Sequence, residues 1–387
     1  MNRKNREEMK PKIFVFYLVI CGLLFTGSSL LHAQKSNTYC NPLNLGYAYE
    51  HTWTEEPHES FRSAADPKKV FPKKLVDPFP QPGWDPALFV DDDGRMYFYW
   101  GSGNDPSYNY IKGVEVDPHN GFNNKGPVKE LFFIYPNEHG WERFGENNMD
   151  TLTSPYVEGS WMTKHNGKYY LQYAAPGTEW NVYADGVYVS EHPLGPFTYQ
   201  PSNPFSYKPG GYIRGAGHGS TMRDKYGNYW HVATMQISVK YKFERRIGLF
   251  PAGFDNEGQL YCITAFGDYP QRILPGPADH TGGIFAISDF RVFGMPEGAK
   301  PETVRNFTIV RAADTRNLTL AWDAVTAAYA YNIYYGIAPE KLYNCVMVID
   351  QDRLNLRGLN RDVNYYFSIQ AIGENGISGL TDVQKVE

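Results

Sequence analysis

The sequence predicts an all-β protein, and two observations carry this prediction. Residues 85–265 consist mainly of short runs rich in Tyr, Val, Phe and Trp, interrupted by Gly, Pro, Asn and Asp. No segment in this range has the 3.6-residue apolar period of an amphipathic helix. A third observation, a pattern of strand, turn and strand that recurs in the same range, predicts the architecture.

Each copy of the pattern has a head residue, a glycine nine positions later and an aromatic residue three positions after the glycine. Copies begin at Asp85, Glu158 and His218, and a fourth begins at Leu249, which is not polar. Glycine allows the positive φ of a tight turn before the returning strand. The first three heads are 73 and 60 residues apart, which leaves room for two further strands in each copy. The sequence therefore predicts the four-stranded blades of a β-propeller, whose innermost strands bring Asp85, Glu158 and His218 to one funnel.

Composition limits the classes of function. The chain has 387 residues, enough for two or three domains, and a net charge of -5 without long runs of Lys or Arg. This charge excludes nucleic acid as an expected partner. The 30 tyrosines suit stacking on sugars and packing in a core equally well.

The first 33 residues have the organisation of a secretory signal. Basic residues near the start precede an apolar run at 13–24, and small or polar residues lead to Ala33. We expect cleavage after Ala33, export to the periplasm or the medium, and no stable membrane insertion afterwards. An uncleaved anchor is the alternative, although the apolar run is short for a bilayer span.

Five motifs of the chain resemble glycoside hydrolase family 43, the five-bladed propeller glycosidases of plant-polysaccharide breakdown. In order they are "SAADP" (63–67), "WDPALFVDDDG" (84–94), "VEGSWMTKHNGKYYLQYAAPGT" (157–178), "GAGHGS" (215–220) and "ERRIGLFPAGFD" (244–255). The resemblance implies a catalytic domain at 34–278 and hydrolysis of α-L-arabinofuranosyl or β-xylosyl residues of plant cell-wall glycans. It implies no required cofactor.

The resemblance further implies an inverting mechanism in which Asp66 is the general base and Glu158 is the general acid. Asp85 is implied to tune the pKa of Glu158 and to orient the reacting groups. Inversion needs one protonated carboxyl group and a second carboxylate that activates water. A negative charge on Asp85 would raise the pKa of Glu158 and so help it to keep its proton. Structural alternatives remain, because Asp before Pro often starts a turn and Glu158 also suits the edge of a strand.

Three further residues are candidate contacts with the sugar: His218, Arg245 and Trp161. In many family members the residue that matches His218 holds a calcium ion, so His218 is also a candidate ligand for a structural calcium. Packing is the alternative role for a single histidine, and calcium prefers oxygen ligands. An ordinary surface role is the alternative for Arg245.

The segment 67–84 departs from the family pattern. Asp66 and Asp85 are only 19 residues apart, and the segment between them contains five prolines and four lysines. Such a segment cannot form a four-stranded sheet. We therefore expect an internal deletion near 67–84 and a propeller of the five-bladed type that lacks about one blade. A non-catalytic glycan-binding protein, or an inactive remnant of the enzyme, is the alternative function.

Three cysteines follow the predicted signal: Cys40, Cys262 and Cys345. An exported protein meets oxidising conditions. In the family, the segment that contains Cys40 runs beside the last blade, where Cys262 lies. The resemblance therefore favours a disulfide between Cys40 and Cys262.

The C-terminal part predicts a second β domain. Residues 282–294 resemble one strand of a discoidin-type domain, so 279–299 is interpreted as a linker with a remnant of that domain. Residues 300–387 resemble a fibronectin type III sandwich. Trp322 has the character of a buried core residue, and Leu359 precedes Tyr365 by six residues, as in a tyrosine corner.

Overall fold

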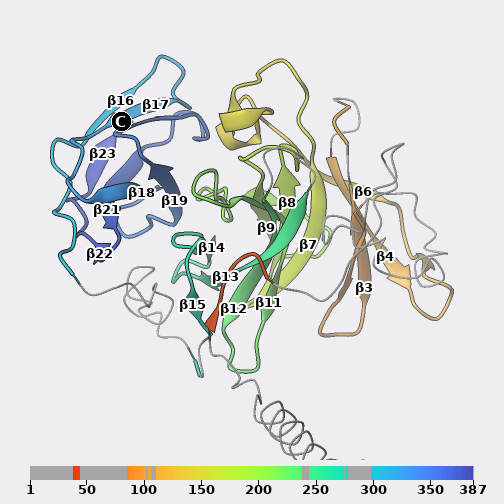
Figure 1. The fold of residues 1–387 in the computed structure, drawn as a ribbon. Coiled ribbons are helices and arrows are strands. Elements are labelled where there is room, and N and C mark those ends of the chain that lie inside the picture. The colour runs from red at the N-terminus through yellow and green to blue at the C-terminus, as the bar shows by residue number, and fades with distance from the viewer. Residues whose placement is uncertain are drawn as a thin grey trace, which may run out of the picture.

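The computed structural model describes residues 38–43, 85–101, 103–105, 110–237, 244–273, 276–277 and 298–386 (Figure 1). Asp66 and three segments for which the sequence made predictions lie outside the described residues. These segments are 1–33, 67–84 and 282–294. The regular structure of the described part consists almost entirely of β-strands, as predicted. Within it, no helix is long and apolar enough to cross a membrane.

Three antiparallel sheets, here called blades 1 to 3, follow one another along the chain. Blade 1 has the order β2-β3-β4-β5, and β6 also pairs with β4. Blade 2 has the order β10-β9-β8-β7, and blade 3 the order β11-β12-β13-β14. In blade 1 the strands are β2 (Ala87–Val90), β3 (Met96–Trp100), β4 (Tyr110–Asp117), β5 (Asn123–Asn124) and β6 (Lys129–Phe133). In blade 2 they are β7 (Glu158–His165), β8 (Lys168–Ala175), β9 (Ala184–Ser190) and β10 (Thr198–Tyr199). In blade 3 they are β11 (Arg214–Arg223), β12 (Tyr229–Gln236), β13 (Arg245–Phe254) and β14 (Leu260–Cys262).

The first three copies of the sequence pattern coincide with the first hairpin of each blade. The turn glycines Gly94, Gly167 and Gly227 have φ values of +82°, +79° and +93°, the conformation for which glycine is suited. The second pair of strands predicted for each copy is also present. The pattern therefore located the innermost hairpin of all three blades.

The fourth copy of the pattern does not begin a further blade. Leu249 and Tyr261 lie on β13 and β14, which are the outer strands of blade 3. Gly258 does adopt a positive φ of +78°, because the same turn chemistry closes any hairpin, whether inner or outer.

The short strand β1 (Thr38–Tyr39) pairs with β15 (Gln271–Arg272) and lies against blade 3. The Tyr39 hydroxyl donates to the carbonyl of Leu249, and the amide of Asn41 donates to the same carbonyl. The N-terminal segment thus runs beside the last described blade, as the resemblance implied.

The expected disulfide between Cys40 and Cys262 was wrong. Both cysteines are free. Tyr39, rather than Cys40, faces blade 3, and the next side chain of an extended segment points the opposite way. Cys40 is accordingly exposed, whereas Cys262 is buried with Tyr170 and Phe250. Burial raises the pKa of the Cys262 thiol well above its ordinary value.

The C-terminal strands form two further sheets, together called the sandwich. One has the order β16-β17-β20 and the other β19-β18-β21-β22, with β23 also paired to β21. The strands of the first are β16 (Thr308–Arg311), β17 (Leu318–Ala321) and β20 (Arg353–Leu356). Those of the second are β18 (Ala328–Gly336), β19 (Asn344–Ile349), β21 (Tyr365–Gly373), β22 (Gly376–Ile377) and β23 (Gln384–Val386). Trp322 is buried, as predicted, and its ring packs edge-on against Tyr331.

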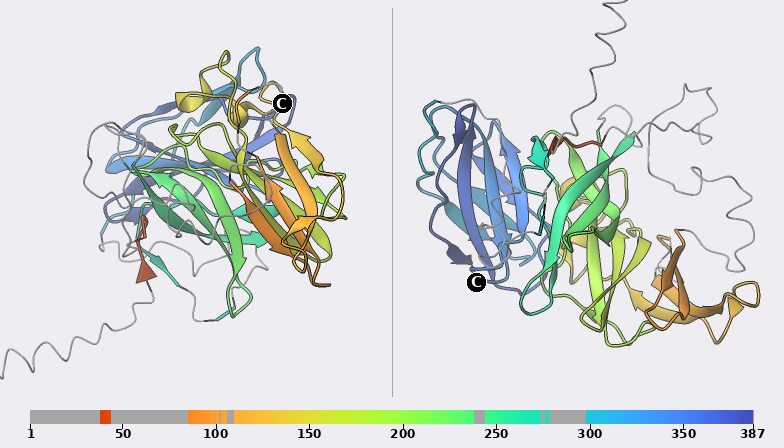
Figure 2. Two further views of the ribbon diagram at one scale, coloured as in Figure 1. Left: turned by 90° about the vertical axis from the view of Figure 1, so that its right-hand side faces the viewer. Right: turned by 90° about the horizontal axis from the view of Figure 1, so that it is seen from below.

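The sandwich packs directly on the blades. Figure 2 shows it beside blade 3, with blade 1 on the far side of the molecule. The connection from β6 to β7 contains the 3-10 helices η2 (Gly140–Glu142) and η3 (Glu146–Asn148) and reaches the sandwich. There the amide of Gly140 donates to the carbonyl of Leu359 at 2.9 Å, and Arg143 forms an ion pair with Asp314 at 2.5 Å. One hydrophobic cluster contains both Trp141 and Leu359, so blades and sandwich share a core.

Candidate active site

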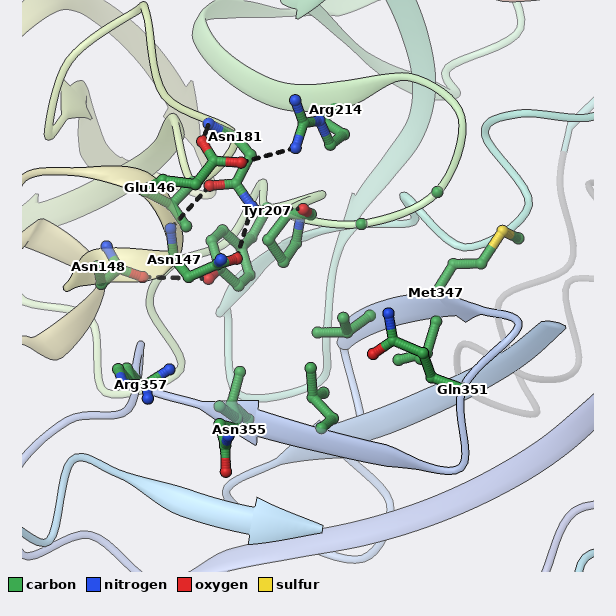
Figure 3. A pocket seen from close by; sticks show the side chains of 18 of the residues that line it. Glu146, Asn147, Asn148, Asn181, Tyr207, Arg214, Met347, Gln351, Asn355 and Arg357 are labelled. Atoms are coloured by element: carbon green, nitrogen blue, oxygen red, sulfur yellow. Dashed lines mark hydrogen bonds and ion pairs between the residues drawn. The ribbon is translucent and has the colours of Figure 1, made fainter. Parts of the chain in front are cut away.

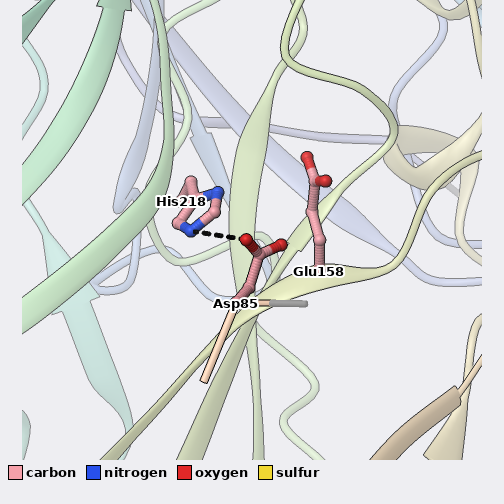
Figure 4. A group of neighbouring side chains, drawn as sticks. All are labelled: Asp85, Glu158 and His218. Carbon is pink, nitrogen blue, oxygen red and sulfur yellow. Dashed lines mark ion pairs between the residues drawn. The ribbon is translucent and has the colours of Figure 1, made fainter. Parts of the chain in front are cut away.

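The polar heads of the three hairpins meet at one point (Figure 4). Asp85 lies two residues before β2 of blade 1, Glu158 begins β7 of blade 2, and His218 lies on β11 of blade 3. One ligand atom from each lies within 4.8 Å of the others, and Nε2 of His218 is 4.0 Å from Oδ1 of Asp85. The repeat thus correctly predicted a convergence of residues that are far apart in the sequence.

The backbone at this point adopts conformations that are uncommon for residues with side chains. Asp85 has a φ of +53° and His218 a φ of +50°. The pairing of β7 with β8 is irregular between Glu158 and Trp161. Bulges and positive φ values re-aim side chains, and they are concentrated at functional sites.

Gly159 lets His218 approach the neighbouring strand. Its φ is +63°, and a Cβ at this position would lie 2.9 Å from Cγ and Cδ2 of the His218 ring. A glycine is therefore required both by the backbone conformation and by the contact.

Tyr183 connects two members of the cluster. Its hydroxyl donates to Oε1 of Glu158 at 2.5 Å and lies 3.2 Å from Nδ1 of His218. Sequence reasoning missed this residue, which immediately precedes β9 and belongs to no copy of the repeat. The spacing pattern contains no signal that separates it from the other tyrosines.

The surroundings of Glu158 favour its protonated form. Burial is the largest cause of its raised pKa, and the negative charge of Asp85 acts in the same direction. The charges of His218 and Arg245 and the hydrogen bond from Tyr183 oppose them and lower the pKa. Burial and the charge of Glu158 also raise the pKa of Tyr183 well above its ordinary value, so the tyrosine stays a donor.

Arg245 and Trp161 occupy different places around the cluster. Arg245 is buried at the start of β13, and its charge is close enough to act on Glu158. The indole Nε1 of Trp161 donates to the carbonyl of Thr221 at 3.0 Å, which ties blade 2 to blade 3. Asp66, the predicted base, lies outside the described residues.

A buried polar network supports the part of β11 that carries His218. Oδ2 of Asp185 accepts from the amide of Gly219 at 2.8 Å and lies 2.9 Å from Nε2 of His231. Nδ1 of His231 in turn lies 3.0 Å from Oγ1 of Thr221. Both Asp185 and His231 are fully buried, and neither was singled out from the sequence, because isolated polar residues within strands carry no spacing signal.

The residue types of the cluster are also those of a metal centre. Among the described residues, Asp85, Glu158 and His218 are the one group of three acidic, His or Cys side chains with suitable spacing. Calcium takes about six to eight oxygen ligands, whereas this group offers two carboxylates and an imidazole. The described donors therefore do not fit a calcium ion.

Comparisons with known proteins point to one family. Residues 52–260 match the family model described as glycosyl hydrolases family 43. A beta-xylosidase of Xylanibacter ruminicola is 31% identical over 134 residues, which cover 30% of this chain and 39% of the relative. An arabinoxylan arabinofuranohydrolase of Paenibacillus polymyxa is 36% identical over 124 residues, covering 30% of this chain and 17% of the relative. In these matches the chain spans about two fifths or less of the length of its curated relatives.

Some solved structures are also similar to this chain. A thermostable family-43 glycoside hydrolase has a TM-score of 0.39 and 24% identity, covering 50% of this chain and 60% of that chain. A xylan beta-1,4-xylosidase of Bacillus halodurans has a TM-score of 0.40 and 17% identity, covering 79% of this chain and 67% of that chain.

Proposed function

Because this chain belongs to glycosyl hydrolases family 43, we propose that it is a glycoside hydrolase of the xylosidase or arabinofuranosidase type. The observation that carries the proposal is the meeting of Glu158 with Asp85 in a setting that raises the pKa of Glu158. A general acid at neutral pH needs such a raised pKa, since it must hold a proton until the leaving oxygen takes it.

In the proposed reaction Glu158 protonates the oxygen of the leaving group. Asp85 keeps Glu158 protonated by charge repulsion, and Tyr183 fixes the orientation of its carboxyl group. Water attacks the anomeric carbon from the opposite face and gives its proton to Asp66, so the configuration inverts. The role of Asp66 follows from the resemblance of the motif at 63–67 to the family.

The proposed substrate is an α-L-arabinofuranosyl or β-xylosyl residue exposed on a plant polysaccharide or oligosaccharide. Support comes from the relatives of this chain, which include a beta-xylosidase and an arabinoxylan arabinofuranohydrolase. Arg245, Trp161 and His218 are the proposed contacts with the sugar. No step of the proposed reaction needs a redox or nucleotide cofactor, and no step involves calcium.

Export and domain organisation are part of the same proposal. Residues 1–33 would be the signal, 34–278 the catalytic propeller with a deletion near 67–84, and 279–299 a linker. Residues 300–387 would form a fibronectin type III-like domain. In support of the last, the amide of Asn360 donates to the Tyr365 hydroxyl at 3.0 Å, the contact expected of a tyrosine corner.

One observation favours a second candidate, a glycan-binding remnant without catalysis. The 18 residues between Asp66 and Asp85 are too few for a four-stranded blade, and a misplacement of the base by about 1 Å costs on the order of 100-fold in rate. In this case the aromatic funnel would bind sugar but not cleave it.

Hydrolysis of nitrophenyl arabinofuranoside, xyloside and galactoside tests the proposal. We expect turnover of at least one substrate. On a xylo-oligosaccharide, whose leaving alcohol must be protonated, Glu158→Gln should lower kcat by about 10²- to 10⁴-fold, whereas the loss on a nitrophenyl glycoside should be smaller. Asp66→Ala should abolish turnover of the same substrate. If all three substrates stay intact at high enzyme concentration while the protein still binds xylo-oligosaccharides, the remnant is the correct function.

A further inference from the structure

Tyr183, which donates to Glu158, is the last residue of the connection between β8 and β9, residues 176–183, here called the β8–β9 connection. The connection contains two consecutive turns. The amide of Trp180 donates to the carbonyl of Gly177, and the amide of Tyr183 donates to the carbonyl of Trp180, both at 3.2 Å. Because turns have few backbone hydrogen bonds of their own, the position of Tyr183 depends on what holds the connection from outside.

Asn181 is the first anchor of the β8–β9 connection. Its side-chain nitrogen donates to Oδ1 of Asn147 at 2.9 Å, and its own Oδ1 accepts from the amide of Asn147 at 2.9 Å. The same nitrogen donates to the carbonyl of Pro209 at 2.8 Å. Asn181 is buried, so a residue without these polar atoms would leave its partners with unsatisfied hydrogen bonds.

Gln236, the last residue of β12, is the second anchor. Its side-chain nitrogen donates to the carbonyl of Glu179 at 2.9 Å, and its Oε1 accepts from Arg214 at 3.2 Å. Gln236 pairs directly with Arg214 across β11 and β12, so their side chains lie on the same face of blade 3. The buried side chain of Gln236 therefore ties the β8–β9 connection to the first two strands of blade 3.

The two anchors are linked to each other (Figure 3). Glu146 accepts from the amide of Asn181 at 3.3 Å and from Arg214 at 2.7 Å, and Arg214 also donates to Gln236. The contacts thus form a ring that leaves the connection at Asn181 and returns to it at Glu179. Asn181, Glu146 and Arg214 also line a cavity of about 530 Å³. Side chains beside a cavity have fewer packing contacts, so hydrogen bonds contribute more to holding them in place.

We propose that Asn181 and Gln236 are positioning residues that keep the hydroxyl of Tyr183 on the carboxyl group of Glu158. Asn181 fixes the chain two residues before Tyr183, a span of at most about 7 Å, and Gln236 fixes it four residues before Tyr183. A hydrogen bond weakens steeply as its geometry departs from the ideal, so a displaced connection weakens the contact with Glu158. The inference rests on the proposed function, because this contact affects a rate only if Glu158 is the acid.

A spectroscopic experiment on the full chain tests the position of Tyr183 without using activity. The tyrosines are labelled with ¹³C at Cζ, the atom that bears the hydroxyl, and the resonance of Tyr183 is the one that Tyr183→Phe removes. Glu158→Ala shows where this resonance lies when the hydroxyl has lost its acceptor. We expect Asn181→Leu and Gln236→Met each to move the resonance of Tyr183 in the direction that Glu158→Ala defines.

Gln200→Met is the matched control. Gln200 is also buried and also joins blades 2 and 3, because it accepts from the amide of Leu260 at 2.8 Å and donates to the carbonyl of Leu260 at 2.9 Å. These contacts lie at β14, the outermost strand of blade 3, so the resonance of Tyr183 should stay in place. Thermal unfolding verifies that each variant keeps its fold, and either test variant decides the question if the other does not fold.

Kinetics on an oligosaccharide that the wild-type protein hydrolyses add a second test. Gln236→Met should lower kcat on the order of tenfold and change KM little, because the acid is misplaced while the sugar contacts remain. In the Tyr183→Phe background the same change should have little further effect, since the contact through which Gln236 acts is already absent.

The inference is overturned if the resonance of Tyr183 stays in place in both test variants, or if it moves as far in Gln200→Met. Full additivity of the kinetic effects of Gln236→Met and Tyr183→Phe would also overturn it. Failure of the proposed function has a different signature. A protein that hydrolyses no glycoside, but in which both test variants move the resonance of Tyr183, keeps the positioning of Tyr183 and loses only the enzymatic function.

Discussion

The hydroxyl of Tyr183 lies 2.5 Å from Oε1 of Glu158 and donates a hydrogen bond to it. This contact stabilises the ionised carboxylate, whereas burial and Asp85 disfavour it. Because Tyr183 also lies 3.2 Å from Nδ1 of His218, one side chain adjusts the proton affinity of the candidate acid and fixes its neighbour.

Tyr183→Phe is expected to raise the pKa of Glu158 further, because the hydrogen bond that favours ionisation is lost. The rate falls at high pH where the acid loses its proton, so the alkaline limb of the kcat/KM profile should move to higher pH. Tyr99→Phe is the control, since its hydroxyl donates to the carbonyl of Pro193 instead. An alkaline limb that stays in place, or moves to lower pH, would contradict the assignment.

Gly159→Ala should reduce both stability and activity. An alanine at this position would have to keep the positive φ, and its methyl group would lie 2.9 Å from the His218 ring. We therefore expect a loss of about 1–3 kcal/mol in the free energy of unfolding. Gly167→Ala separates the two causes, because Gly167 has a φ of +79° but no atom within 4 Å of the added methyl. Denaturant unfolding should therefore give a smaller loss for Gly167→Ala, and only Gly159→Ala should lower kcat. Equal effects of the two changes would exclude the contact with His218 as a cause.

Asp185→Asn tests the network behind His218. The change weakens the contact with His231 and the support of Gly219, at a cost of about 1–3 kcal/mol. If Asp185 is a positioning residue, kcat should fall while KM changes little, because the part of β11 that carries His218 loosens.

The matched control for Asp185 is Asp224→Asn. Asp224 accepts hydrogen bonds from Asn228 and Trp230 at the outer end of the same hairpin. The Asp224→Asn variant should have a lower melting temperature than the wild type but an unchanged kcat. Were both variants to lose kcat in proportion to stability, the role of Asp185 would be structural only.

Asp314→Asn should weaken the attachment of the sandwich to the blades, with little effect on the structure of the blades. Hydrogen bonds from Arg316 and Arg143 hold the pKa of Asp314 below its ordinary value. A depressed pKa means that the stabilisation is present above the ordinary pKa of Asp, about 4, and is lost as the pH falls toward the folded-state pKa. The variant should unfold at lower temperature than the wild type at pH 7, and the difference should narrow in acid. A difference that is independent of pH would contradict the ionic contribution.

The hairpins could be predicted from the sequence because their turns depend on local chemistry. Gly94, Gly167 and Gly227 must adopt positive φ, and the distance from each head to its glycine fixes where the inner strand starts. The same locality explains the error at Leu249, since a turn pattern specifies a hairpin but not its place within a sheet.

Tyr183, Asp185 and His231 could not be found in this way. Their contacts join blades 2 and 3, and each depends on how two sheets pack rather than on a spacing along the chain. The disulfide failed for a related reason. The segment at Tyr39 lies beside blade 3 as implied, but alternation along an extended segment turned Cys40 to the solvent.

The hydrophobic cluster that contains both Trp141 and Leu359 bears on how this protein can be engineered. A shortened chain that stops after blade 3 would leave Trp141 and its aromatic neighbours facing water, which invites aggregation. Anyone who wishes to move the three blades into another protein should expect to move the C-terminal sheets with them.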